Sequence, residues 1–203
     1  MPLSTVLGAQ SLIKPGVCTT ATRPASPYTG QMIYDTTVSQ TLVWNGTAWI
    51  GTGRIAQVVS TNLTSTFSTA ATSYTDITGL SVSITPTTST SKVLVWVNFS
   101  ASVSADISVM FRLMRDSTAI NIGDTAGSRT RASAAMMADN TVLQYGTFGW
   151  NYLDSPATTS STTYKVQMFV NSGTGYIGRT GQDTDAANRP RTASNITVME
   201  VFA

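Results

Sequence analysis

The chain contains no histidine among its 203 residues. Without an imidazole there is no Ser-His-Asp or Cys-His catalytic group and no histidine ligand for a metal. The single cysteine, Cys18, cannot form an internal disulfide, so we expect a reduced thiol or a link between chains. Its proline- and glycine-rich surroundings do not favour a nucleophilic role.

Charged residues are also scarce. They make up 11% of the chain, against about a quarter in an ordinary soluble domain. Hydroxyl-bearing, small and amide side chains take their place, which suits a protein that presents much of its surface to copies of itself. The formal net charge of +2 is too small to attract nucleic acid, and no basic helix or basic patch is present. We therefore expect no nucleic-acid partner.

Long apolar runs are absent as well. No stretch approaches the roughly 20 residues of a membrane span, so we expect no membrane insertion. The start of the chain lacks the charged and apolar segments of a signal peptide. Four Asn residues match the glycosylation pattern, but a chain rich in Ser and Thr produces such matches by chance, so we expect none to be modified. They are Asn45, Asn62, Asn98 and Asn195.

The stretch that is most informative runs from Arg23 to Gly51. It predicts three short strands, at Gln31–Asp35, Leu42–Trp44 and Ala48–Ile50, with a two-residue hairpin turn at Asn45-Gly46. A sheet this small has little room for a core of its own. Its aromatic residues must therefore pack against a partner chain or an attached domain; they are Tyr34, Trp44 and Trp49.

This stretch resembles a small module common in the tail-fibre and other virion appendage proteins of double-stranded DNA bacteriophages. The resemblance rests on Arg23-Pro-Ala-Ser-Pro27, Gly30-Gln-Met-Ile-Tyr-Asp35 and Leu42-Val-Trp-Asn-Gly-Thr-Ala-Trp49, about a seventh of the chain. Such modules typically precede a trimeric β-rich tip or decoration domain. The resemblance implies a virion structural protein, assembled in the host cytoplasm, without saying where on the particle it is located.

Residues 1–22 are predicted to be an extended arm that docks on another subunit. Prolines and glycines interrupt the segment too often for a helix, yet it is too apolar for a plain solvated tail. A disordered leader is the alternative. The candidates for trimer or attachment contacts come from this arm and from the module that follows at 23–53: Leu12, Ile13, Val17, Tyr34, Trp44 and Trp49.

Residues 54–203 are predicted to form an antiparallel jelly-roll-like sandwich, following a flexible joint at Gly51–Gly53. Strands of alternating or apolar character recur every 8 to 12 residues or so, with turn residues between them and no helical period. Lys92–Phe99 is apolar on both faces, which predicts a strand covered on both sides. Asn151–Ser161 is predicted to be a loop. The domain also weakly resembles trimeric jelly rolls of the complement-globular and tumour-necrosis-factor type.

The acidic residues offer a weak case for catalysis or metal binding. A glycosidase needs two facing carboxylates, and Asp183 and Asp185 are the closest pair, but an Asp-x-Asp loop is more often turn chemistry than a calcium site. Glu200 lies on an apolar strand and is expected to be an edge residue or an ion-pair partner. We expect no cofactor, no metal and no enzymatic activity.

Two loops carry arginines that form a candidate outer binding surface for anionic host glycans or an acidic capsid face. Solvated loops, or pairing with Asp183 and Asp185 across a subunit boundary, are the alternatives. For Trp96 and Trp150 we favour core packing over stacking on sugars. The outer-surface candidates are Arg129, Arg131, Tyr176, Arg189 and Arg191.

These observations predict a non-enzymatic, homotrimeric phage virion protein with an N-terminal arm, a small β-meander and a jelly-roll domain. Its partners would be other virion proteins, of the tail or the major capsid, and possibly a host cell-surface glycan. Three functions remain open. The first is a tail fibre or fibre tip that binds the host surface. The second is a capsid decoration or cement protein, or a head fibre, and the third is a polysaccharide depolymerase.

Overall fold

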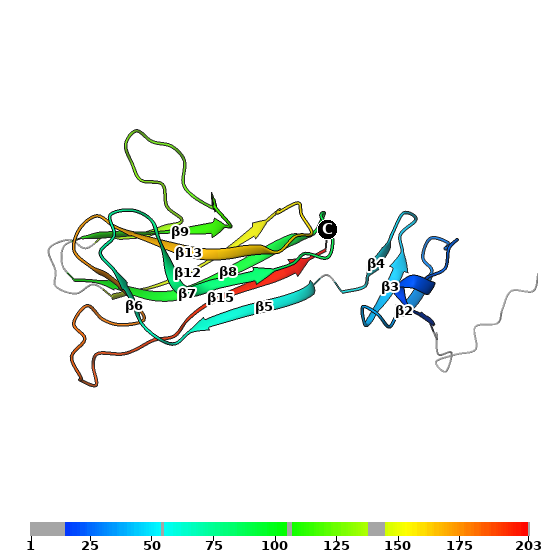
Figure 1. The fold of residues 1–203 in the computed structure, drawn as a ribbon, viewed down its shortest axis with the longest axis horizontal. Coiled ribbons are helices and arrows are strands. Elements are labelled where there is room, and N and C mark those ends of the chain that lie inside the picture. The colour runs from blue at the N-terminus through cyan, green and yellow to red at the C-terminus, as the bar shows by residue number, and fades with distance from the viewer. Residues whose placement is uncertain (1–14, 54, 105–106, 138–144, 203) are drawn as a thin grey trace, which may run out of the picture. The chain divides into compact units, whose positions relative to one another are not determined.

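The computed structural model describes residues 15–53, 55–104, 107–137 and 145–202. The chain divides into two compact units, Met1–Arg54 and Ile55–Ala203, which are drawn in Figure 1 and described separately here. Leu12 and Ile13 lie outside the described residues. Both units are built from strands, so the predicted all-β class is confirmed. In the described part of the chain no helix is long and apolar enough to cross a membrane.

The first unit, which we call the module, is one four-stranded sheet in the order β1-β2-β3-β4. Its elements are β1 (Gly16–Cys18), the 3-10 helix η1 (Thr20–Thr22), β2 (Met32–Asp35), β3 (Gln40–Trp44) and β4 (Trp49–Gly51). The prediction of three strands missed β1, which pairs in parallel with β2. The end of the predicted arm is therefore part of this sheet. Nothing in Gly-Val-Cys alone marks a strand, because its pairing partner lies 17 residues further along the chain.

The turn between β3 and β4 differs from the predicted two-residue hairpin. Trp44 and Trp49 are the last paired residues, so four residues form the loop. The Asn45 side chain accepts hydrogen bonds from the backbone of Thr47 and Ala48, at 2.9 and 2.8 Å, and thereby closes the longer loop. Gly46 supplies a positive φ of 100°, a conformation that glycine adopts without strain.

The second unit is a sandwich of two sheets. Its strands are β5 (Ile55–Leu63), β6 (Phe67–Thr69), β7 (Thr75–Ile84), β8 (Lys92–Val103), β9 (Ser108–Arg115), β10 (Thr118–Ile120), β11 (Ala134–Met137), β12 (Tyr145–Asp154), β13 (Thr162–Val170), β14 (Gly175–Ile177) and β15 (Ser194–Val201). One sheet has the order β5-β15-β8-β12, with β14 and β6 continuing β15 and β5. The other has the order β7-β13-β9, with β10 and β11 sharing the far side of β9.

This connectivity is that of a jelly roll. Counted as eight principal strands in chain order, the two sheets read 1-8-3-6 and 2-7-4-5, and every pairing is antiparallel. Successive strands therefore alternate between the sheets for much of the chain. As a result the first and last strands of the unit, β5 and β15, are neighbours.

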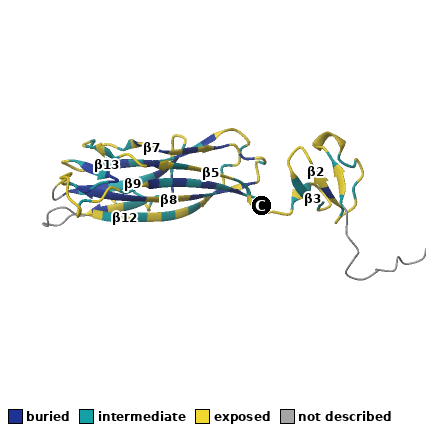
Figure 2. Cartoon of the chain, turned by 90° about the horizontal axis from the view of Figure 1, so that it is seen from below, coloured by how far each residue is buried: buried dark blue, intermediate teal, exposed yellow. Residues whose placement is uncertain are grey.

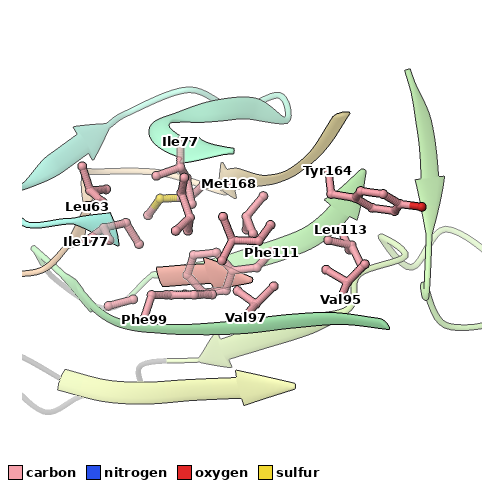
Figure 3. Packing of buried hydrophobic residues seen from close by; sticks show 14 of the residues in the cluster. Leu63, Ile77, Val95, Val97, Phe99, Phe111, Leu113, Tyr164, Met168 and Ile177 are labelled. Atoms are coloured by element: carbon pink, nitrogen blue, oxygen red, sulfur yellow. The ribbon is translucent and has the colours of Figure 1, made fainter. Parts of the chain in front are cut away.

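The core lies between the two sheets. Alternate residues of β8 point inward, and Figure 3 shows Val95, Val97 and Phe99 facing Phe111 and Leu113 of β9. The Phe99 and Phe111 rings meet edge-on at 4.7 Å, a favourable aromatic geometry. Trp150 packs on the same cluster, 5.4 Å from Phe99, as core packing predicts.

Two predictions about this unit are wrong. The stretch Lys92–Phe99 of β8 is covered on one face only, because its even-numbered residues from Leu94 to Asn98 point to the outside, and Trp96 is 47% exposed. Trp96 is therefore not a core residue. Asn151 to Asp154 are not loop but the end of β12, where they pair with β8 from Trp96 to Val93. Residues typical of turns occur here in a strand because a long neighbouring strand holds them.

Candidate assembly surface

One side of the module's sheet is apolar, and none of the module's described residues covers it. Strand register places Val17 beside Tyr34, and Met32 beside Val43, which in turn neighbours Ile50. We call these five residues, with Thr41, the module face. None of them is charged, and Val17 is 65% exposed. Apolar side chains gathered in this way on one side of a sheet are typical of a surface that contacts another protein.

The opposite side of the same sheet is closed by the chain itself. Ile33 and Leu42 are buried there, and Trp44 and Trp49 pack edge-on at 5.5 Å. Alternation along a strand explains the division, because neighbouring residues point to opposite sides. Each side of the sheet thus has a distinct character, one internal and one open.

Asp35 anchors the closed side. Its carboxylate is fully buried and accepts hydrogen bonds from Arg23 Nε at 2.6 Å, Thr20 Oγ1 at 3.0 Å and the Thr37 backbone at 2.8 Å. Burial by itself raises the pKa of Asp35, but these hydrogen bonds and the charge of Arg23 outweigh it and hold the pKa below its ordinary value. The ion pair ties the segment after η1 to strand β2.

The structure brings only part of the predicted contact set together. Val17 and Tyr34 are cross-strand neighbours on the module face, whereas Trp44 and Trp49 lie on the closed side. Met32, Val43 and Ile50 are not among the predicted contact residues, although they alternate along the strands with the buried Ile33 and Leu42. That alternation was the available signal.

The predicted arginine surface is divided between two loops. Arg129 and Arg131 lie in the loop between β10 and β11, where each donates to a backbone carbonyl of the same loop. Arg189 and Arg191 lie between β14 and β15. Figure 1 draws the first loop at the top of the sandwich and the second at its bottom, so the five predicted residues do not form one patch.

The loop between β14 and β15 contains its own charge network. Asp183 pairs with Arg191 at 2.7 Å and with Arg179 at 2.6 Å, and the Arg179 guanidinium lies over the Tyr176 ring at 4.0 Å. Arg189 donates to the Gln182 side chain at 2.7 Å. Arg191 and Asp183, one of the pairs expected across a subunit boundary, thus pair within one chain. Arg179 was not predicted, since a single arginine beside a glycine gives no signal.

Glu200 is neither an edge residue nor an ion-pair partner within the described residues, which contradicts the expectation. It is fully buried on β15, between β5 and β8. Gln57 Nε2 donates to one carboxylate oxygen, and the backbone and hydroxyl of Thr87 donate to the other, each at 2.7 Å. Burial tends to raise the pKa of Glu200, but hydrogen bonds led by that from Gln57 hold it below its ordinary value.

Asp154 occupies the same cross-strand row of the sheet as Glu200, with Val93 between them. Its carboxylate pairs with Arg115 at 3.0 Å and accepts the Tyr164 hydroxyl at 2.7 Å, which links the two sheets. Burial and this hydrogen bond raise the pKa of Tyr164 far above its ordinary value. Both carboxylates have their hydrogen-bonding capacity taken up inside the protein, and this suits a structural role. Among the described residues no cluster of three or more acidic or thiol groups could hold a metal.

Together the two units define an all-β protein that combines a jelly-roll sandwich with a small sheet whose apolar face is open. No protein-family profile matches the chain, and no curated protein matches it. One solved structure with some likeness is the "Structure of infectious bursal disease virus Gx strain", at 13% identity and a TM-score of 0.32. That match covers 78% of this chain and 45% of the viral one, so the chain spans less than half of that protein's length. A likeness this weak assigns no function.

Proposed function

We propose that the chain is a non-enzymatic structural protein of a bacteriophage virion, a tail fibre or fibre-tip protein that functions as a homotrimer. Its N-terminal part attaches it to the particle, and its sandwich is presented to the host surface. The resemblance of Arg23–Gly51 to virion appendage modules supports this proposal. The observation that carries it is the module face, an uncharged apolar surface that the described chain leaves open.

The proposal is tested by incorporation into particles. Val17→Asp and Tyr34→Asp place a carboxylate on the module face, whereas Thr47→Asp places one on the exposed turn of the same module. We expect each face variant to lower the copies per particle at least about tenfold, because a buried unpaired carboxylate costs several kcal/mol. Thr47→Asp should be incorporated normally. Quantitative mass spectrometry of purified particles measures this, and equal incorporation of all variants would refute the role of the module face.

A capsid decoration or cement protein, or a head fibre, is the second candidate, and the uncovered module face serves it equally well. Cryo-electron microscopy of the same particles separates the two. A few copies at the tail support the fibre, and hundreds of copies over the head support decoration. Polysaccharide depolymerisation is the third candidate. Loss of a measured activity in Asp183→Asn or Asp185→Asn would support it over both structural roles.

A further inference from the structure

On the outer surface of the sheet β5-β15-β8-β12, a region that spans all four strands has no charged side chain, and the outward, exposed Lys92 of β8 lies at its border. Strand register aligns its outward residues in three successive rows. The first row is Val58, Met199, Leu94 and Leu153; the second is Ser60, Thr197, Trp96 and Asn151; the third is Asn62, Asn195, Asn98 and Gly149. We call these three rows the neutral face.

The first row is a continuous apolar band. Val58 and Leu153 are 55% and 47% exposed, on the two outer strands, and Trp96 extends the band into the second row. Four strands spaced by about 4.8 Å make the band roughly 14 Å wide. Figure 2 shows exposed positions that alternate with intermediate ones along β12, and outward positions that alternate with buried ones along the first part of β8. A band of this kind on a folded domain marks a contact surface rather than scattered surface residues.

The outer surface of the other sheet is different in kind. There the Asp76 carboxylate accepts hydrogen bonds from Lys165 and Gln167, each at 2.6 Å. The side-chain oxygen of Gln167 in turn accepts a hydrogen bond from Arg112 at 2.8 Å. The Arg112 guanidinium lies over the Tyr74 ring at 4.0 Å. On this sheet Asp76 is therefore paired with Lys165 inside the chain, and Arg112 is held by Gln167 and by the Tyr74 ring. The three rows of the neutral face contain no such charges, and Lys92 lies at their border.

The absence of charge identifies the kind of partner. Two copies of a charged surface meet at the cost of like-charge repulsion, whereas two neutral surfaces meet in any orientation without it. Interface centres are depleted of charge in just this way. A sugar ligand would find one exposed indole and several amides, but four adjacent aliphatic side chains offer it no hydrogen bond. The band therefore fits an apolar protein surface better than a glycan.

We propose that the neutral face is the contact between copies of this chain, with Val58, Trp96 and Leu153 as its most exposed apolar side chains. This inference rests on the proposed homotrimer and gives it a surface. Ser60 and Thr197, beside the band, already pair with each other at 2.8 Å. Burial of these two hydroxyl groups in the contact therefore does not leave them without a hydrogen-bond partner.

The first test is the oligomeric state of the full chain. Leu153→Asp and Val58→Asp place a charge in the band, and Ser81→Asp places the same charge on an exposed strand position of the other sheet. By sedimentation analysis, each band variant should raise the dissociation constant at least about 30-fold, the effect of losing an interface hot spot. Ser81→Asp should leave it unchanged. A monomeric wild-type chain, or an oligomer that all variants retain, would overturn the proposal.

Cysteine accessibility keeps the proposal testable if a band variant fails to fold. In a Cys18→Ser background, Asn151→Cys reports on the neutral face and Ser81→Cys on the other sheet. Maleimide should label position 151 at least tenfold more slowly than position 81 in the oligomer, and equally fast after dilution to monomers. Equal labelling in the oligomer would refute the surface. A monomer that binds a neutral polysaccharide through Trp96 would replace the proposal by a glycan site.

These outcomes are separate from those of the proposed function. An oligomer that survives charge in the band refutes the surface, yet such a chain can still be a virion protein. A chain absent from particles refutes the virion role, while sedimentation and labelling still decide how its copies meet.

Discussion

The two units of the chain bury their apolar residues in different ways. The sandwich presses one face of each sheet against the other, so Phe99, Phe111 and Leu113 have protein on all sides. The module has a single sheet and can close only one side of it, over Ile33 and Leu42. The sandwich therefore buries apolar side chains on one face of each of its sheets, whereas the module has an ion pair on its closed side and exposed apolar side chains on the other.

The largest effect should come from the sandwich core. Phe111→Ala removes a fully buried ring that contacts Phe99 and Phe148, and should lower the free energy of unfolding by about 3–5 kcal/mol. Denaturant unfolding followed by circular dichroism measures this. Ser81→Ala, at an exposed strand position, is the control. A loss below about 1 kcal/mol would contradict internal stability of the sandwich.

A smaller effect is expected from the buried carboxylate of the sandwich. Glu200→Gln puts an amide where three hydrogen-bond donors converge, and it should lower the free energy of unfolding by about 1–3 kcal/mol at neutral pH. Because folding lowers the pKa of Glu200, its contribution is complete above the ordinary value of 4.5 and is lost as the pH falls through the folded value. The difference in the free energy of unfolding between wild type and variant should therefore become smaller in acid. A difference that stays constant with pH would contradict this linkage.

In the module, Asp35→Asn should act locally. The variant removes the negative charge that pairs with Arg23. Folding lowers the pKa of Asp35, so the stability that its carboxylate contributes to the module is lost as the pH falls below the ordinary pKa of 3.8. In acid the wild-type module should therefore behave like the variant. Amide hydrogen exchange should accelerate in β1 and β2 and stay unchanged in β13. Thr47→Ala, in the exposed turn, is the control. Faster exchange throughout the sandwich would show that the two units are not independent.

The smallest effect is expected from an exposed ion pair of the sandwich. Lys165→Met breaks the contact with Asp76 on the outer surface of the second sheet, where both side chains are partly exposed to solvent. The loss should not exceed about 1 kcal/mol, and it should shrink in high salt. Thermal unfolding at two salt concentrations measures it. A larger loss would mean that surface charge contributes to sandwich stability as its core does.

Much of the sandwich could be predicted because its strands alternate. Leu80, Val82 and Ile84 are apolar at every second position, and all three are buried. For β8 the same rule failed, since Leu94 and Trp96 are as apolar as the inward valines beside them. The sequence shows that a side chain is apolar, but it does not show whether residues of the same chain or of another molecule cover it.

The remaining errors come from contacts between distant segments. Gly16–Cys18 becomes a strand only through pairing with Ile33–Asp35, and Asn151 through pairing with Trp96. The position of Glu200 likewise depends on donors from Gln57 and Thr87, more than a hundred residues earlier in the chain. No local pattern records such partners. The prediction that Tyr34 and Trp44 belong to one contact surface failed for the same reason. Strand register, which the local sequence does not show, places them on opposite sides of one sheet.

The pairing of β5 with β15 has a consequence for the order of events in the cell. Ser194–Val201 is inserted between β5 and β8, so neither of these strands has its native neighbour on that side until the ribosome has made residue 201. Closure of so distant a contact is slow compared with folding from local contacts. The neutral face exists only once this strand is in place. A chain whose synthesis has not reached β15 therefore lacks the neutral face, the surface through which we propose that copies associate.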